Sequence, residues 1–209
     1  MSLEKYRIQH KKIDNLMTKS QKTHFKNITY DFMLKYYSDE KIGVFYAKSI
    51  NKNGKTYRVN SINKIKLKNH ERENAIWLVE LLGGKIHFLP EIHSEESVNM
   101  ADYKYFPRRG KSFFIENKEI ILLSNQKNVS ASNISHKIEE NKNQSNVYLI
   151  DVTMGNLSDY EILIRVEKVY TNQRTKFRTI ILIIKNNNDL FGIFANKKSE
   201  PPESSGSTH

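Results

Sequence analysis

Residues 71–90, with the sequence ERENAIWLVELLGGKIHFLP, contain a helix, its end and the strand that follows it. Apolar residues at helical spacing predict a helix from about Asn69, with one apolar face formed by Ala75, Ile76, Leu78, Val79 and Leu82. Gly83-Gly84 predicts the end of this helix, because glycine adopts the left-handed cap conformation without strain. Residues 85–89 then form a predicted strand that is closed by Pro90.

Beyond this unit the sequence continues to alternate between strands and helices. Strands are predicted at Ala101–Phe106, Phe113–Leu123, Val147–Asp151, Thr179–Lys185 and, at the edge of the sheet, Leu190–Phe194. Helices are predicted at Ser132–Asn143, with Ser132 as the N-cap, and from Ser158 to about Val169. The core order is helix-strand-strand-strand-helix-strand, so we expect an α+β fold with a central mixed β-sheet flanked by helices.

The N-terminal part of the chain precedes this core. Residues 3–34 are predicted to be largely helical, and Ile42–Tyr46 to form a strand. Asn51-Lys52-Asn53-Gly54 favours a turn, with Lys55–Val59 as the second arm of a hairpin. We therefore expect a basic helical segment at residues 1–40, an α+β domain at 41–196, and a disordered Pro/Ser/Gly-rich tail at 197–209.

The charge is strongly positive and unevenly distributed. The net charge is +11, and residues 1–70 hold 16 Lys and Arg against 5 Asp and Glu, whereas the remainder holds 18 of each kind. This excess favours a polyanionic partner such as nucleic acid, with an acidic protein surface or simple solvation as alternatives. Cysteine is absent, which excludes disulfides and thiolate metal ligands. No apolar signal segment or membrane-length run is present, so we expect a cytoplasmic protein without a membrane partner.

Asp102, Glu116 and Lys118 form the constellation best suited to chemistry. Residues two apart on a strand share a face, so Glu116 and Lys118 project together and Asn117 points away. If Asp102 lies on the adjacent strand, two hard oxygen ligands meet, and these favour Mg²⁺ or Mn²⁺ beside a scissile phosphate. Glu73, or its neighbour Glu71, would add a carboxylate from the first helix. The alternative is an exposed strand with ordinary cross-strand pairs.

Two further groups of residues are candidates for contact with nucleic acid. Basic side chains that would hold phosphates occur in one turn and along one strand start: Arg108, Arg109 and Lys111, then Arg174, Lys176 and Arg178. As solvated surface residues they are explained equally well. His87 and His93 flank the candidate site, and either would serve as a general acid if RNA were cleaved without metal.

Short motifs along residues 57–194 also resemble a known domain. They are Glu71-Arg72-Glu73-Asn74-Ala75, Leu82-Gly83-Gly84-Lys85-Ile86, Leu89-Pro90-Glu91, Ala101-Asp102-Tyr103, Glu116-Asn117-Lys118 and Asn143-Gln144-Ser145-Asn146, which leads into Leu149-Ile150-Asp151-Val152-Thr153. This order resembles a nuclease-like domain of PD-(D/E)XK-like topology that occurs in phage structural proteins and mobile elements. That domain is similar to the toxic tRNA-nuclease domains of contact-dependent inhibition systems.

The resemblance implies a role for each matched residue. Asp102 and Glu116 would be the catalytic acids and metal ligands, Lys118 would position the phosphate, and Gln144 would be a polar site residue. It also implies cleavage of tRNA-like RNA or DNA, and an immunity protein as a partner. The chain departs from the pattern in having Met100-Ala101 before the aspartate and large apolar residues after the lysine. A second hypothesis is therefore an inactive binding module on the same fold, such as a mobile-element inhibitor of a host RNA-guided defence nuclease.

Overall fold

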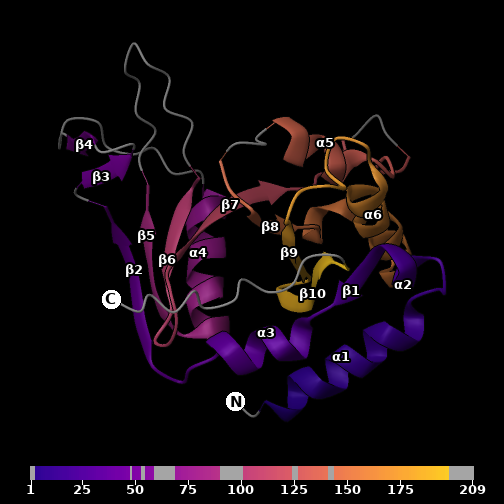
Figure 1. The fold of residues 1–209 in the computed structure, drawn as a ribbon, viewed down its shortest axis with the longest axis horizontal. Coiled ribbons are helices and arrows are strands. Elements are labelled where there is room, and N and C mark those ends of the chain that lie inside the picture. Colours follow the sequence, from indigo (N-terminus) through magenta and orange to yellow (C-terminus); the bar gives the residue numbers. More distant parts are fainter. Residues whose placement is uncertain are drawn as a thin grey trace, which may run out of the picture.

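The computed structural model of the chain describes residues 3–47, 49–52, 55–58, 69–89, 101–123, 127–140 and 144–197. Its central feature is an eight-stranded mixed β-sheet with helices packed against it (Figure 1). The strand order is β1 (Phe25–Asn27), β10 (Asp189–Asn196), β9 (Ile181–Asn186), β8 (Val147–Asp151), β7 (Phe113–Glu119), β6 (Tyr103–Phe106), β5 (Gly84–Phe88) and β2 (Lys41–Tyr46). This confirms the predicted α+β fold with a central mixed sheet.

The predicted core order appears as α4-β5-β6-β7-α5-β8. The helices are α1 (Glu4–Leu16), α2 (Gln21–His24), α3 (Thr29–Tyr36), α4 (Asn69–Leu82), α5 (Asn133–Glu140) and α6 (Asp159–Thr171). Gly83 and Gly84 end α4 with φ angles of +75° and +69°, as the sequence predicts. Ser158 begins α6 through a capping box with Glu161, which satisfies two backbone N–H groups at the helix start.

Side chains of β8 and β9 alternate between two hydrophobic cores. Tyr148 and Ile150 of β8 pack with residues of α5 and α6. Val147 and Leu149 pack instead with residues of α3 and α4. We call these two sides of the sheet the α6 face and the α4 face. The alternation explains why β8 is buried along its whole length.

The N-terminal segment is part of the same sheet rather than a purely helical addition. The predicted helix over residues 3–34 is divided into α1, α2 and α3, with β1 between α2 and α3. β1 pairs antiparallel with β10. The prediction that Leu190–Phe194 is an edge strand is therefore wrong, because β1 occupies that edge. Tyr6 and Ile13 of α1 are almost completely buried, so α1 contributes to the cores directly.

Several element limits differ from those predicted. The hairpin is formed by β3 (Ser49–Lys52) and β4 (Lys55–Arg58), whereas β2 joins the main sheet by pairing parallel with β5. β7 ends at Glu119, because its partner β8 gives way to the 3₁₀ helix η1 (Thr153–Gly155). Residues 90–100, which include His93 and Glu91, lie outside the described residues, as do Asn143 and the tail from 198.

Candidate active site

Strand register brings the two predicted acids to one place. β6 and β7 are antiparallel, with Tyr103 opposite Ile115. One residue further along this register, Asp102 lies opposite Glu116, and opposite residues on antiparallel strands are close neighbours. Asp102 accepts a hydrogen bond from the Asn117 backbone N–H at 2.7 Å, which fixes its carboxylate beside β7.

Glu116 and Lys118 project from the same side of β7, as the strand alternation predicts. The Lys118 Nζ lies 2.6 Å from Glu116 Oε1, and the Glu116 side chain is only 2% exposed. Burial, and after it the neighbouring Asp102 charge, raise the pKa of Glu116 to about 7 against the opposing effect of Lys118. One ammonium thus neutralises the two carboxylates only in part, so the site favours an additional positive charge.

Glu71 is associated with this site through the buried Tyr103. The Tyr103 hydroxyl donates to the Glu71 backbone carbonyl at 2.6 Å. Burial raises the pKa of Tyr103 well above its usual value, and the charges of Asp102, Glu71 and Glu116 raise it further. Glu73, the first choice of the sequence analysis, is exposed on α4, and no described contact joins it to Asp102 or Glu116. Glu71 is therefore the better-placed acid on this helix.

Tyr148 and Arg178 extend the site along the α6 face. Tyr148 of β8 lies directly opposite Glu116 of β7. Arg178 Nη2 donates to the Tyr148 hydroxyl at 3.3 Å and to the Ser145 carbonyl at 3.2 Å. Burial raises the pKa of Tyr148, and Arg178 opposes this effect. The sequence analysis missed Tyr148, although strand alternation within residues 147–151 would have placed it on the same face as Ile150.

A buried polar network lies on the opposite side of the same strands. Asn74 of α4 donates to Asn117 Oδ1 at 3.1 Å, and Lys185 Nζ donates to Asn74 Oδ1 at 2.7 Å. Lys185 also pairs with Asp151 at 2.7 Å, with both side chains under 10% exposed. The network ties α4 to β7, β8 and β9 directly behind the candidate site. It accounts for Asn117, whose side chain points away from Glu116 as predicted.

The other predicted contact residues are spread over the molecule. Arg108 lies in the turn between β6 and β7, at the opposite end of β6 from Asp102, and it pairs with Glu40 at 2.6 Å. Arg109 and Lys111 are exposed in this same turn. The expectation that Arg174, Lys176 and Arg178 alternate along a strand is wrong, because they occupy turns before β9. Arg174 pairs with Glu139, so Arg178 alone of the three is joined by a described contact to a residue beside Glu116.

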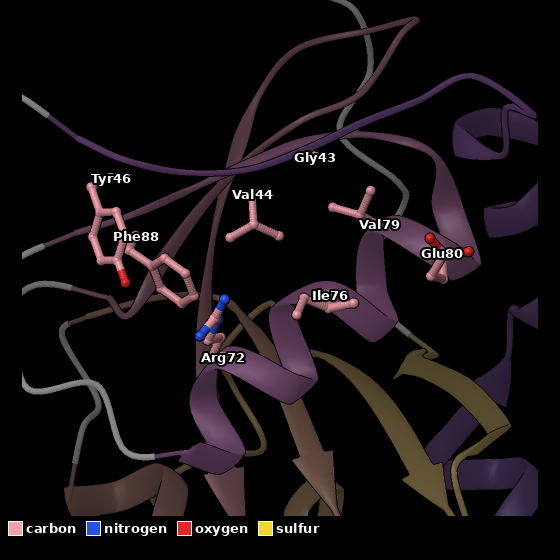
Figure 2. A pocket seen from close by; sticks show the side chains of 8 residues that line it. All are labelled: Gly43, Val44, Tyr46, Arg72, Ile76, Val79, Glu80 and Phe88. Atoms are coloured by element: carbon pink, nitrogen blue, oxygen red, sulfur yellow. The ribbon is translucent and has the colours of Figure 1, made fainter.

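Two hollows adjoin the sheet. One of about 580 Å³ is lined by Ser112, Phe113, Phe114, Gln144, Ser145, Asn146 and Val147, and thus includes the predicted polar residue Gln144. The other, of about 310 Å³, lies between β2 and α4 (Figure 2). Its wall is mostly apolar, with Val44, Ile76 and Phe88 around it. It lies on the α4 face, whereas Glu116 and Lys118 lie on the α6 face, so it is separate from the candidate site.

No protein family, curated protein or solved structure matches this chain. Within the described parts of the chain, no helix combines the length and the apolar character that crossing a membrane requires.

The donor set at this site fits a hard divalent cation. Mg²⁺ is commonly held by one or two carboxylates, with waters and substrate phosphates completing the coordination. Asp102 and Glu116 supply two such carboxylates, and the pKa of Glu116 is raised first by its burial and then by the neighbouring Asp102 charge. Within the described residues, no group of three or more His, Cys, Asp and Glu is arranged to hold a metal. A cation here would thus depend on water and phosphate for its remaining ligands.

Proposed function

We propose that this protein is a divalent-metal-dependent nuclease that cleaves phosphodiester bonds in RNA or DNA of the cytoplasm. The observation that supports it most is the convergence of Asp102, Glu116 and Lys118 on neighbouring strands. Lys118 lies 2.6 Å from Glu116, and the Asp102 charge raises the Glu116 pKa. Two carboxylates beside one ammonium form a set that can bind a cation and a phosphate together.

Each residue has a distinct task in this proposal. Asp102 and Glu116 would hold Mg²⁺ or Mn²⁺, and the bound cation would polarise the phosphate and lower the pKa of an attacking water. Lys118 would exchange its contact with Glu116 for a non-bridging phosphate oxygen and stabilise the charge that develops there. Tyr148, which is buried opposite Glu116 and whose hydroxyl accepts a hydrogen bond from Arg178, would hold the Glu116 side chain in place rather than contact the substrate.

Cleavage assays with Mg²⁺ or EDTA test this proposal. Total tRNA and plasmid DNA would be incubated with the wild type, Glu116→Gln and Lys118→Met. We expect Mg²⁺-dependent cleavage of one substrate class by the wild type, and a loss of about 100-fold or more in each variant. Glu73→Gln, on the exposed side of α4, is the matched control and should cleave at the wild-type rate. Equal cleavage by Glu116→Gln would contradict the assignment.

The alternative function is a binding module without catalysis, and the charge distribution favours it specifically. Residues 41–70 hold eight Lys and Arg and no Asp or Glu. Such a segment binds nucleic acid by counterion release whether or not a catalytic site is present. A salt-sensitive gel shift by the wild type without cleavage in Mg²⁺ or Mn²⁺ would favour this function over the nuclease.

A further inference from the structure

A row of side chains crosses four neighbouring strands on the α6 face. Phe45 of β2 lies opposite His87 of β5, His87 opposite Lys104 of β6, and Lys104 opposite Phe114 of β7. Phe45 and His87 are in ring contact, with centroids 5.9 Å apart. Aromatic and basic side chains therefore follow one another across the sheet, perpendicular to strands that lie side by side (Figure 1).

Two further side chains join this row into a continuous surface. Phe106 contacts His87, with ring centroids 4.8 Å apart. Lys85 Nζ lies 5.1 Å from the Phe106 ring centroid, and Lys104 Nζ lies 5.3 Å from the rings of both Phe106 and Phe114. We call these six residues the basic-aromatic patch: Phe45, Lys85, His87, Lys104, Phe106 and Phe114.

The patch is open to solvent although it is largely aromatic. Phe45 is 43% exposed and Phe114 41% exposed. The strands that contribute to the hydrophobic core of the α6 face are β1, β8, β9 and β10, and no described residue of β2, β5 or β6 belongs to it. Phe45 and Phe114 thus face water and Phe106 is half-buried, whereas the β8 and β9 part of this sheet face is covered by α5 and α6. Aromatic side chains exposed in this way mark a binding surface.

The patch is also positively charged and continuous with the candidate active site. On this face of β5, β6 and β7, the described acids are Asp102 and Glu116 of the site itself. They form the next row along the strands, about 7 Å from Lys104 and Phe114 at two residues per row. Positive potential at the patch is reflected in His87, whose pKa is lowered by burial and then by Lys85 and Lys104.

We propose that the basic-aromatic patch binds an unpaired stretch of nucleic acid and leads it into the Asp102–Glu116 site. Bases would stack on Phe114, Phe106 and Phe45, because every base offers a π-face to an aromatic ring. Lys85 and Lys104 would neutralise the phosphates between them. Duplex cannot use such a surface, since its bases are already stacked on one another. The hollow that begins at Phe114 and includes Gln144 offers room for one more nucleotide.

This inference names the substrate class of the proposed nuclease, but the patch can be tested by binding alone. A fluorescent 12-nucleotide RNA without secondary structure, the same sequence as single-stranded DNA, and the corresponding duplex would be titrated with full-length Glu116→Gln in EDTA. We expect the single strands to bind more tightly than the duplex. Binding of both single strands would identify unpaired nucleotides in general, and a preference for RNA would assign the 2′-hydroxyl a role.

Single substitutions distinguish base stacking on the aromatic rings from phosphate neutralisation by the lysines. Phe114→Ala should weaken single-strand binding about tenfold without changing its salt dependence. Phe114→Tyr should retain binding, which also excludes loss of folding as the cause. Lys104→Gln should reduce the slope of log K against log salt by about 0.7, the value for one phosphate of a single strand. Two variants are the matched controls and should bind normally. Tyr46→Ala changes the residue next to Phe45 on β2, whose side chain lies on the α4 face, and Lys5→Gln removes a lysine of α1.

The outcomes distinguish this inference from the proposed function. Duplex binding as tight as single-strand binding, or unchanged binding by Phe114→Ala and Phe45→Ala, would overturn the patch assignment and leave the nuclease untouched. Single-strand binding that depends on Phe114, in a protein that cleaves nothing in Mg²⁺ or Mn²⁺, would overturn the nuclease and support the patch. If the patch binds a protein surface instead, neither single strand will bind with the dependence on Phe114 and on salt that is expected above.

Discussion

Replacement of Glu116 by Gln should remove a loss of stability that the wild type shows as pH rises toward alkaline values. Burial and the Asp102 charge raise the pKa of Glu116 from 4.5 to about 7. A carboxyl group with a raised pKa in the folded state binds more protons there than in the unfolded chain between these two pH values. The free energy of unfolding therefore falls as pH rises through this window. Glu116→Gln removes the titrating group and with it this fall.

The magnitude follows from the difference between the two pKa values. At about 1.4 kcal/mol for each pKa unit, a group that moves from 4.5 to about 7 loses about 3 kcal/mol of stability in total. Most of this loss, about 2–3 kcal/mol, falls between pH 5 and pH 8.5. The contact with Lys118 depends on the charge of Glu116, and its effect is already included in the pKa of about 7. Any effect of Glu116→Gln that is independent of pH cancels when the two pH values are compared.

Urea unfolding followed by circular dichroism in EDTA measures this difference. The wild type should lose about 2–3 kcal/mol more than Glu116→Gln between pH 5 and pH 8.5. Glu73→Gln, at an exposed glutamate of α4, is the control and should follow the wild type. Parallel pH profiles of the wild type and Glu116→Gln would refute the account, because they would mean that Glu116 is not held beside a second carboxylate in a buried site.

Three further predictions concern the scaffold. Lys185→Met should destabilise the protein by about 3–5 kcal/mol in urea unfolding, because it leaves a buried carboxylate unpaired, whereas Lys5→Met at an exposed pair should change stability by less than about 1 kcal/mol. Gly83→Ala should lower the unfolding temperature more than Gly110→Ala: both residues have positive φ, but a Cβ at Gly83 would lie 2.3 Å from a backbone oxygen, whereas the nearest atom at Gly110 is 3.7 Å away. Ser158→Ala should cost about 1 kcal/mol and speed hydrogen exchange in the first turn of α6. The Lys185–Asp151 pair would be contradicted if Lys185→Met left stability unchanged. The crowding at Gly83 would be contradicted if the two glycine substitutions had equal effects, and the Ser158 cap if hydrogen exchange in α6 were unchanged.

Local sequence signals were sufficient for the core but not for strand order. The helix over α4, its Gly83-Gly84 end and the strands that follow are determined by residues close in sequence. The pairing of β1 with β10 joins residues 25–27 to residues 194–196, and nothing in either segment marks the other. β2 likewise lies at an edge of the sheet because it pairs parallel with β5, although the sequence suggested one hairpin.

The candidate site was predictable only where one strand determines it. Alternation along β7 placed Glu116 and Lys118 together and Asn117 on the other face. Tyr148, by contrast, depends on the register between β7 and β8, and the basic-aromatic patch depends on the register of four strands at once. Each of its residues alone is an ordinary surface or half-buried side chain, and only their alignment across the sheet suggests a binding surface.

Mn²⁺ binding followed by electron paramagnetic resonance tests the central claim most directly, because it asks whether Asp102 and Glu116 share one cation. The account predicts that the wild type binds Mn²⁺ more tightly as pH rises through about 7, where the raised pKa of Glu116 lies. Glu116→Gln should bind at least about tenfold more weakly and lose this pH dependence. Equal Mn²⁺ affinity of the wild type and Glu116→Gln at pH 8 would contradict the account.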